Sequence, residues 1–405
     1  MDILFISSWR TLFHTTPELA HMKLAHSLQN IQPSYIREIL RAASVPGVIS
    51  LAGGLPDSTQ FPLSLMKPSL QALAEQPSLF QYGNTQGFEP LLDYFGNAYQ
   101  LTNQQKALVC TGSQQALDLI ARAFINPGDA IIMEAPSYLG ALQVFGLAQA
   151  NILSVGQNKD GPDLNQLETL FVQQDIKMFY GVPDFHNPTG VCWSLWVRKE
   201  VARLCQQYNV TLVEDIPYRE LRFAGTALPI ASSFCPEHAL VLRSYSKIAT
   251  PGIRIGLVYG NQEWIDALIK VKQGSDLHTS VPMQAVLLHL LQHNEFNLHL
   301  QNLRVLYGRR YQKLMEQLKL KLPAQCTANP VDGGMFIWLT LTELADCDIL
   351  AVAQAALKNG VAVVPSCVFY QPKEKQVSAL RLNFTHAREE ELVLAVDRLK
   401  AVVPH

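Results

Sequence analysis

Short apolar segments that alternate with helix-length segments are the feature that most constrains how this chain folds. Residues 130–133, 177–182, 210–213 and 239–242 each have the length and apolar character of a buried strand, and residues 195–208 have the pattern of a helix between two of them. Such alternation predicts an α/β fold with a mostly parallel central sheet sandwiched by helices. Polar, Gly or Pro residues follow the predicted strands, and ligands bind at that carboxyl edge in sheets of this kind.

The length of 405 residues predicts more than one domain, because single hydrophobic cores rarely grow this large. We expect an N-terminal extension at 1–25, a helix and segment at 26–80 that pack with the small domain, a large domain at 81–300 and a small α+β domain at 301–405. With 48% hydrophobic and 16% charged residues, the chain has the composition of a compact globular protein. The net charge of −2 favours neither nucleic acid nor an anionic membrane as a partner.

The cysteines and histidines show no pattern of a disulfide framework or a metal site. The seven cysteines are scattered and include no CxxC pair, which is typical of reduced thiols in a cytoplasmic protein. His289 and His293 have a spacing that can hold zinc, but the Glu expected after the first His and a third ligand are absent, so we predict no metal. No apolar run approaches the ~18 residues of a membrane span, and no basic segment precedes the apolar residues near the start, so no secretory signal is predicted.

Residues 244–256 combine a lysine, two serines, a Pro-Gly turn and an arginine directly after a predicted buried strand. Burial lowers the pKa of an amine, which makes Lys247 a candidate for Schiff-base chemistry. Ser244, Ser246 and Arg254 can bind one phosphate between them. A lysine beside a phosphate clamp indicates pyridoxal 5'-phosphate (PLP), whereas the simpler alternative is a Ser-rich turn with two surface cations.

Two further turns have the chemistry of a ligand site. Gly112 and Ser113 join a predicted strand at residues 106–111 to a helix, and the free N–H groups at the start of a helix attract anions. Gly53 and Gly54 end another predicted strand and allow a ligand to approach the backbone closely, although a simple turn would use them equally well.

Together these features resemble the class I/II aminotransferases, the fold-type I PLP enzymes. The resemblance extends from about residue 25 to the end of the chain and is carried by motifs in the family's order and approximate spacing: Gly112-Ser113-Gln114-Gln115, Asn187-Pro188-Thr189-Gly190, Asp215 to Tyr218, Ser244-Tyr245-Ser246-Lys247 with Arg254, and Arg381-Leu382-Asn383-Phe384. Residues 50–56, 183–187, 277–279 and 333–336 resemble the 2-aminoadipate and kynurenine aminotransferase II branch, which includes the catalytic-like domain of MocR-type regulators.

The resemblance implies a role toward PLP for each matching residue. Lys247 is the catalytic lysine that forms the Schiff base and moves the substrate's proton, and Asp215 is the catalytic carboxylate that pairs with the pyridinium nitrogen. Tyr218, also implied to be catalytic, and Asn187 bond the ring's phenolate oxygen, while Tyr138 stacks on the ring face. The residues implied to hold the phosphate are Ser113, Gln114, Ser244, Ser246 and Arg254.

The resemblance also implies substrate contacts and a second subunit. Arg381 pairs with the substrate's α-carboxylate through a bidentate contact, and Gly54 and Asn187 border the substrate. Arg37 matches an arginine of a mobile helix that meets the substrate's side chain. Tyr82 matches a tyrosine that reaches the phosphate from the neighbouring subunit, which implies a homodimer.

By the same resemblance, the chain is expected to be a PLP-dependent aminotransferase. It would move an amino group from an L-amino acid, such as 2-aminoadipate or an aromatic residue, to a 2-oxo acid such as 2-oxoglutarate, in ping-pong order through pyridoxamine phosphate. One alternative is another PLP reaction at the same site, a β-lyase or a decarboxylase, because the bond that breaks depends on which one stands perpendicular to the ring. The other is a non-catalytic PLP sensor, for which residues 1–25 are too short to supply a DNA-binding domain.

Three residues depart from the family's usual pattern. His186 stands where Gln usually precedes the Asn-Pro-Thr-Gly motif, Ile216 where an acidic residue often follows the aspartate, and Ser366 where Gly is common after Val-Pro. None of the three removes a group that the chemistry needs. We expect His186 and Ser366 to border the site and to influence which substrate is accepted.

Overall fold

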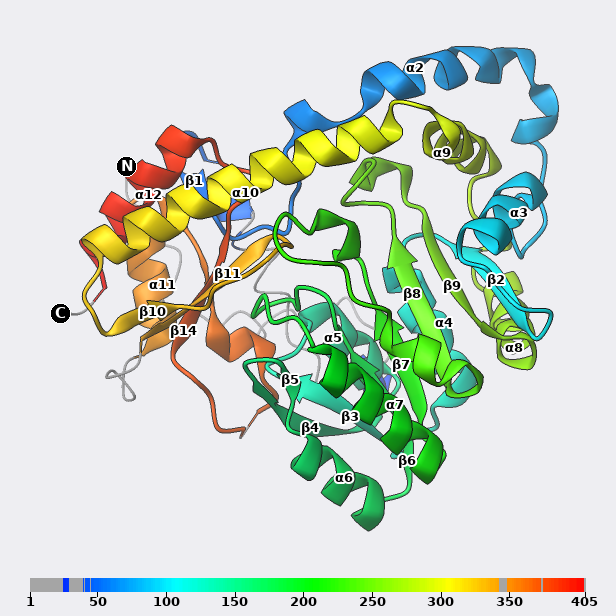
Figure 1. The fold of residues 1–405 in the computed structure, drawn as a ribbon, viewed down its shortest axis with the longest axis horizontal. Coiled ribbons are helices and arrows are strands. Elements are labelled where there is room, and N and C mark those ends of the chain that lie inside the picture. The colour runs from blue at the N-terminus through cyan, green and yellow to red at the C-terminus, as the bar shows by residue number, and fades with distance from the viewer. Residues whose placement is uncertain are drawn as a thin grey trace, which may run out of the picture.

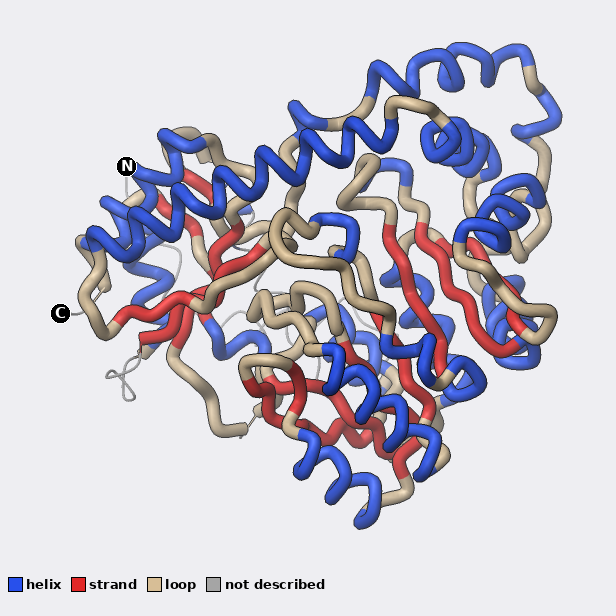
Figure 2. The backbone as a smooth tube through the Cα atoms, viewed as in Figure 1, coloured by secondary structure: helices blue, strands red, loops and turns tan. Residues whose placement is uncertain are grey.

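The computed structural model describes residues 25–28, 39, 41–43, 45–341, 348–372 and 374–403. These residues form a larger and a smaller body, each built around a β-sheet (Figures 1 and 2). In Figure 1 the strands of the larger sheet are coloured cyan to green, those of the smaller sheet orange to red, and one long yellow helix runs along both bodies. The predicted α/β fold with a mostly parallel central sheet is confirmed.

Among the described residues, the larger sheet has eight strands in the order β2-β9-β8-β7-β6-β3-β4-β5. All pairs from β8 to β4 are parallel, whereas β9 is antiparallel to both of its neighbours and β5 is antiparallel to β4. The strands are β2 (Gln105–Cys110), β3 (Ala130–Ala135), β4 (Asn151–Asn158), β5 (Gly161–Pro162), β6 (Ile176–Gly181), β7 (Thr211–Asp215), β8 (Ala239–Ser244) and β9 (Gly256–Asn261).

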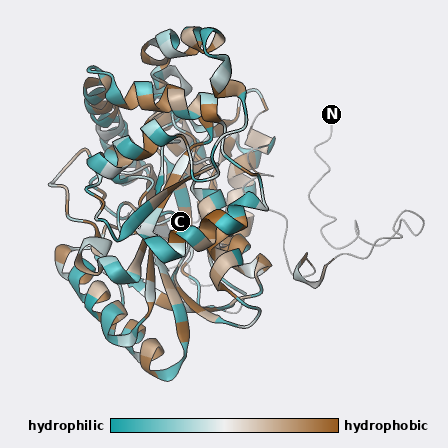
Figure 3. Ribbon diagram, turned by 90° about the vertical axis from the view of Figure 1, so that its right-hand side faces the viewer, coloured by the Kyte–Doolittle hydropathy of each residue, from teal (hydrophilic) through white to brown (hydrophobic). Residues whose placement is uncertain are grey.

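Helices cover both faces of this sheet, which is why its central strands are apolar on both sides. On β7, Leu212 packs into the core beneath α6 and α7, while its neighbour Val213 packs into the opposite core beneath α4, α5 and α8. This alternation follows the two-residue period of a strand. The covering helices are α4 (Ser113–Phe124), α5 (Leu139–Leu147), α6 (Leu164–Gln173), α7 (Leu195–Tyr208) and α8 (Gln262–Gln273). Figure 3 shows brown, hydrophobic stretches along the strands and mixed colours on the outer helices.

The smaller sheet is antiparallel, with the order β10-β11-β14-β13. A two-residue strand, β1, pairs in parallel with β12, and Asn383 N–H donates to the Leu51 carbonyl over 2.8 Å, so the segment around residue 50 is held against this body. The elements are β1 (Ile49–Ser50), β10 (Cys326–Ala328), β11 (Phe336–Leu341), α11 (Ile349–Lys358), β12 (Val361–Ala362), β13 (Val364–Pro365), β14 (Ala379–Asn383) and α12 (Glu389–Lys400).

The helical region at residues 281–321 consists of two helices. α9 (Val281–Gln292) ends where His293 adopts an extended backbone, and α10 (Phe296–Lys321) begins three residues later. The break turns the chain so that Leu290 and Phe296 both enter one core. Because α10 continues through residue 300, the division of the chain at that position stays a prediction.

The chain before β2 forms a helical arm that lies along α9 and α10 in Figure 1. Its helices are α2 (Leu63–Ala72), which packs against α9, and α3 (Glu89–Ala98). Residues 1–24, 29–38, 40 and 44, which include the start of the helix and segment expected at 26–80, lie outside the described residues. No helix in the described part of the chain is both long enough and apolar enough to cross a membrane. Short 3-10 helices are His26–Leu28, Ser58–Gln60, Leu73–Glu75, Pro77–Phe80, Arg219–Leu221, Ala231–Phe234, Pro236–His238, Pro251–Ile253 and Ser366–Phe369.

Candidate active site

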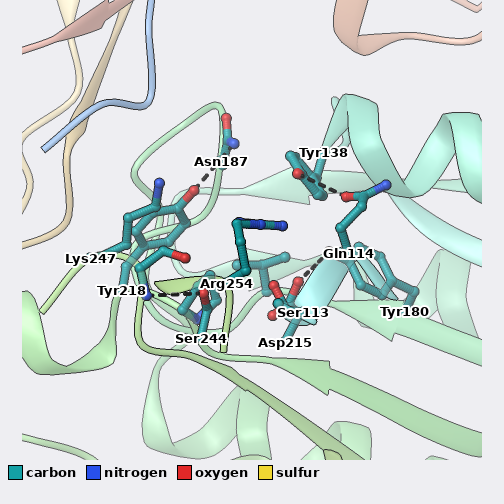
Figure 4. A pocket seen from close by; sticks show the side chains of 14 residues that line it. Ser113, Gln114, Tyr138, Tyr180, Asn187, Asp215, Tyr218, Ser244, Lys247 and Arg254 are labelled. Atoms are coloured by element: carbon teal, nitrogen blue, oxygen red, sulfur yellow. Dashed lines mark hydrogen bonds between the residues drawn. The ribbon is translucent and has the colours of Figure 1, made fainter. Parts of the chain in front are cut away.

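A pocket lies at the carboxyl ends of β6, β7 and β8, beside the start of α4 (Figure 4). This is the edge of the sheet at which the sequence predicts a ligand. The pocket brings together every residue predicted to bind the cofactor except Tyr82. It is lined by Gly112, Ser113, Gln114, Tyr138, Tyr180, Val182, Asn187, Asp215, Pro217, Tyr218, Ser244, Ser246, Lys247 and Arg254.

Lys247 lies just beyond the end of β8, where its Nζ donates a hydrogen bond to the Gly54 carbonyl over 2.7 Å. Burial, with the positive charges of Arg381 and Arg254, lowers the pKa of this amine to about 8. An amine with that pKa is partly neutral near pH 7, so Lys247 can act as a nucleophile and as a base. Gly54, predicted to border the substrate, therefore contacts the lysine through its backbone.

Asp215, the last residue of β7, is oriented by a neighbouring strand. The Tyr180 hydroxyl on β6 donates to Asp215 Oδ2 over 2.9 Å, while Oδ1 is buried and has no hydrogen-bond partner among the described residues. Burial raises the pKa of this carboxyl to about 7, although the bond from Tyr180 opposes the rise. A cationic N–H in the pocket would satisfy Oδ1 and lower the pKa again.

The opposite end of the pocket has the groups of an anion site. Gly112 has a φ of 81° and leads into α4, whose first residue is Ser113. A Cβ on residue 112 would lie 2.8 Å from Arg254 Nη2, so only glycine allows the guanidinium to lie against this turn. Arg254 itself has a left-handed backbone (φ 54°), and Ser244 and Ser246 line the same pocket. The helix start, two hydroxyls and a guanidinium can together hold one phosphate.

Gln114 is held beside this turn by two neighbours. Its Nε2 donates to the Gly140 carbonyl over 3.0 Å, and its Oε1 accepts from the Tyr138 hydroxyl over 3.1 Å. Burial raises the pKa of Tyr138 to about 12, so the phenol stays protonated. Figure 4 shows Tyr138 and Gln114 facing each other along the pocket wall.

Asn187 links the pocket to a buried arginine. Its Nδ2 donates to the Tyr218 hydroxyl over 3.3 Å, and its Oδ1 accepts from Arg381 Nη1 over 2.7 Å. Asn187 follows β6 and Tyr218 follows β7, which explains why residues far apart in the sequence meet at this edge. Burial raises the pKa of Tyr218 far above the physiological range, so its hydroxyl remains a hydrogen-bond donor or acceptor.

Arg381 is a buried cation with no carboxylate partner among the described residues. Its guanidinium stacks over Phe336 at 4.3 Å and Phe369 at 5.0 Å, and it donates hydrogen bonds to Asn187 Oδ1 and to the Ala52 carbonyl. The Nε has no partner in the described chain, and burial lowers the pKa of this group to about 10. An unpaired buried guanidinium is costly, which indicates that an external carboxylate completes it.

One residue predicted to bind the cofactor lies apart from this pocket. Tyr82 is 80% exposed and does not line the pocket of its own chain; its ring packs edge-on against His278. Arg37 lies outside the described residues.

The structure places the three unusual residues away from the pocket lining. His186 is buried against Glu134, with Nε2 3.6 Å from Glu134 Oε2. Ser366 is buried and accepts a hydrogen bond from the Ala379 backbone N–H over 3.2 Å. Ile216 is a core residue. The expectation that His186 and Ser366 border the site is therefore not met in the described residues.

Tyr180 is a pocket residue that sequence reasoning missed. It is next to the last residue of β6, and the sequence signal was a hydroxyl after the apolar residues Met178 and Phe179, two positions before the strand's predicted end. The pattern did not show that Tyr180 faces Asp215, because that contact depends on the pairing of β6 with β7.

These groups fit PLP. The unpartnered Asp215 Oδ1 suits the ring's N–H, the turn at Gly112 suits the phosphate, and the Lys247 amine suits a covalent bond to the carbonyl. In Figure 4 the labelled side chains converge on one space from both sides.

Comparison with known proteins gives relatives across nearly the whole chain. Residues 46–399 match the family model of aminotransferase class I and II. A 2-aminoadipate transaminase of Thermus thermophilus is 32% identical over 375 residues, covering 91% of this chain and 93% of the relative. Aromatic-amino-acid aminotransferase 1 of Thermococcus litoralis is 33% identical over 386 residues, covering 92% of each chain.

A solved structure extends the similarity to three dimensions. The α-aminoadipate aminotransferase LysN of Thermus thermophilus, complexed with N-(5'-phosphopyridoxyl)-L-leucine, superposes with a TM-score of 0.87 at 31% identity. The match covers 94% of this chain and 96% of that one.

Proposed function

The chain belongs to the class I and II aminotransferases, which are PLP enzymes of fold type I, and from that premise we propose that it transfers the amino group of L-2-aminoadipate or aromatic L-amino acids to 2-oxoglutarate. The observation that carries the proposal is the presence of two groups together: a lysine with a pKa lowered to about 8, and a buried arginine that has no acidic partner among the described residues. Lys247 lines the pocket itself, and Asn187 links Arg381 to it.

The pocket residues are proposed to hold the cofactor as follows. When bound, PLP supplies an electron-withdrawing ring that stabilises negative charge on the substrate's α-carbon. Asp215 Oδ1 pairs with the ring nitrogen, and Asn187 and Tyr218 bond the ring oxygen, while Tyr138 covers a ring face. The residues assigned to the phosphate are Ser113, Gln114, Ser244, Ser246 and Arg254.

Lys247 is proposed to have two tasks. Its Nζ would hold the cofactor covalently, and the amine, once free, would accept the proton of the substrate's α-carbon. The lowered pKa serves both tasks, because a fully protonated lysine could neither attack a carbonyl nor accept a proton. The Gly54 carbonyl, 2.7 Å from Nζ, orients the amine between these events.

Arg381 is proposed to bind the α-carboxylate that every amino-acid donor carries. The stacking on Phe336 and Phe369 fixes the plane of the guanidinium, and Asn187 and the Ala52 carbonyl hold Nη1 and Nη2. A carboxylate would neutralise the buried charge, and its two oxygens match the fork of guanidinium donors.

A panel of L-amino acids with 2-oxoglutarate tests the reaction class and the donor together. We expect glutamate to form stoichiometrically with the 2-oxo acid of the donor, most rapidly with 2-aminoadipate or aromatic donors, and initial rates to give parallel double-reciprocal lines. Ammonia or pyruvate released without an acceptor would instead identify a β-lyase, and carbon dioxide would identify a decarboxylase. Binding of amino acids with no turnover would favour a sensor.

We also propose that the active form is a homodimer in which Tyr82 of each subunit completes the phosphate site of the other. Support comes from a cluster of exposed apolar side chains around Tyr82, with Phe80 64% and Leu277 40% exposed. Exposed apolar groups of this size favour association with another surface.

Mixing two inactive variants tests the shared site. Tyr82→Ala and Lys247→Ala subunits are each expected to be inactive, whereas a heterodimer has one site with both Lys247 and the other subunit's Tyr82. Activity that appears on mixing supports the crossing of Tyr82, and a sedimentation profile of pure monomers contradicts it.

We also propose that the protein is cytoplasmic and that its domains divide at residues 25, 80 and 300. The six cysteines that the structure describes are free thiols, which supports a reducing compartment. The two separate sheets support a large and a small domain. Fluorescence of a tagged protein in its host and limited proteolysis at the proposed boundaries test these two proposals.

A further inference from the structure

A buried polar cluster lies behind the loop that presents Asn187. Its central members are Glu134 on β3 and His186, and each side chain is only 1% exposed. His186 directly precedes Asn187 and is one of the residues that departs from the family's pattern. Titratable side chains are rarely buried without a purpose, so the positions of their protons matter.

The donors around Glu134 are fixed by geometry. Oε1 accepts from Gln157 Nε2 over 2.9 Å and from Trp193 Nε1 over 3.0 Å, while Oε2 accepts from the Val182 backbone N–H over 3.1 Å. Because the Gln157 amide directs its nitrogen to Glu134, its oxygen faces the other way. That oxygen accepts a hydrogen bond from the Thr189 hydroxyl over 2.6 Å.

This chain of donors determines the tautomer of His186. Thr189 Oγ1 has one hydrogen, which it donates to Gln157. Toward His186 Nδ1, 3.1 Å away, this oxygen can therefore act only as an acceptor. A proton therefore resides on Nδ1, and a neutral ring has a bare lone pair on Nε2. Nε2 lacks a hydrogen-bond partner in the described chain and faces Glu134 Oε2 at 3.6 Å.

We propose that Glu134 and His186 hold one further proton between Oε2 and Nε2, which makes the pair neutral overall, and that this proton positions Asn187 in the active site. Without the proton, a buried carboxylate would face a nitrogen lone pair, and the two would repel each other. His186 and Glu134 are positioning residues here, because neither lines the pocket.

Burial places this proton on Glu134. It raises the pKa of the Glu134 carboxyl to about 7 and lowers the pKa of the His186 ring to about 3, so both groups favour their neutral forms. The groups that contact the pair are uncharged: Gln157 from β4, the Val182 amide after β6, and Trp193 and Thr189 from the segment before α7. No charged side chain of the described residues contributes to either pKa shift.

The position of Asn187 depends on this pair because His186 anchors the loop. The loop is closed by hydrogen bonds from His186 N–H to the Val191 carbonyl (2.8 Å) and from Gly190 N–H to the His186 carbonyl (2.6 Å). When the shared proton is lost, the carboxylate of Glu134 can repel the lone pair on the imidazole ring of His186. Alternatively, the proton on Nδ1 moves to Nε2, and the hydrogen bond from Nδ1 to Thr189 is broken. In both cases the loop loses an anchor, and the contacts of Asn187 with Tyr218 and Arg381 loosen.

Two spectroscopic measurements test the proton directly in the PLP-bound enzyme. Infrared difference spectra at pH 6 between the wild type and Glu134→Gln should contain the C=O band of a protonated carboxyl. Nitrogen-15 NMR of histidine-labelled wild type, with His186→Gln for assignment, should show protonated Nδ1 and bare Nε2. A ring protonated only on Nε2, with no carboxyl band, would mean a pair with a net negative charge and would overturn the proposal. Neither measurement depends on the proposed reaction.

The pH profile, which rests on the proposed function, tests the consequence for the site. In the wild type, kcat/KM for the donor should fall by about tenfold per pH unit above the pKa of the pair. Glu134→Gln retains an amide proton toward His186 and should lose this alkaline limb. Trp193→Phe removes a donor that favours the ionised carboxyl, so its limb should move to higher pH. Superimposable profiles of wild type and Glu134→Gln, or a shift to lower pH in Trp193→Phe, would refute the positioning role. The nitrogen spectra of the wild type remain decisive even where Glu134→Gln fails to fold.

Discussion

The hydroxyl of Tyr180 donates to one oxygen of Asp215 over 2.9 Å and leaves the other oxygen without a partner in the described chain. The bond favours the ionised carboxylate, and it directs the free oxygen to the space that the ring nitrogen would take.

Tyr180→Phe should therefore weaken the binding of PLP. A hydrogen bond to a charged group contributes about 1.5–3 kcal/mol, so a rise in the PLP dissociation constant of about tenfold or more is expected, measured by absorbance titration of the apoprotein. Tyr138→Phe is the matched control, because its hydroxyl bonds Gln114 and not Asp215. Equal losses in the two variants would contradict a special role for Tyr180.

The contribution of Asp215 to the stability of the apoprotein should fall as pH rises from about 4 to 7. Burial raises the pKa of Asp215 from 3.8 to about 7, so between these values the folded state binds more protons than the unfolded state. The free energy of unfolding should then fall by up to about 1.4 kcal/mol per pH unit from this group alone and level off above pH 7.

Urea unfolding of the apoprotein at pH 5, 6 and 7 measures this slope. Asp215→Asn, which cannot ionise, should lack this falling contribution. The slope that remains in the variant combines Glu134 and Glu214, whose raised pKa values act in the same direction, with His186, whose lowered pKa acts in the opposite direction below about pH 6.5. An unchanged slope in Asp215→Asn would show that Asp215 is already ionised in the apoprotein.

Lys247→Ala should abolish the covalent attachment of PLP. Borohydride treatment of the wild type should fix the cofactor to the peptide that contains residue 247, whereas the variant should yield no such adduct by mass spectrometry. The variant should still bind PLP noncovalently, because the phosphate and ring contacts remain. A reducible adduct at the same site in the variant would contradict the assignment.

Arg381→Ala should lower kcat/KM for every α-amino-acid donor by a similar factor. Loss of one partner of a buried charge pair costs about 2–5 kcal/mol, which corresponds to a fall in kcat/KM of about thirtyfold or more. Steady-state kinetics with one dicarboxylic and one aromatic donor measure the effect, and the PLP absorbance serves as the control for an intact cofactor site. Normal kinetics would refute the role of Arg381.

Arg37→Ala should lower kcat/KM by different factors for donors with different side chains. If Arg37 meets the distal carboxylate, the variant should lose kcat/KM for 2-aminoadipate by about tenfold more than for an aromatic donor, the equivalent of one charge-assisted hydrogen bond. Equal effects on the two donors would mean that Arg37 makes no side-chain contact.

Most of the predicted cofactor residues lie at or soon after the end of a strand, so the local pattern indicated their place, and the family resemblance implied their roles. Asp215, Ser244 and Lys247 are local consequences of where β7 and β8 end, and parallel strands bring such ends together. Tyr180 was missed because it lies within a strand, where the apolar pattern conceals which neighbour a side chain faces. His186 was placed at the site because it is next to Asn187, but its side chain turns to β3.

The sequence by itself determined the alternation of strands and helices, the edge where the ligand binds and the residue types that act on it, because these follow from local periodicity and strand ends. Only the tertiary structure decided which protons and charges are compensated. Among the described residues, Arg381 has no acidic partner, one oxygen of Asp215 has no hydrogen-bond partner, and Glu134 faces His186. Burial and partners of this kind depend on contacts between residues that lie far apart in the chain. The low dielectric of the interior then converts those contacts into the pKa shifts on which the chemistry depends.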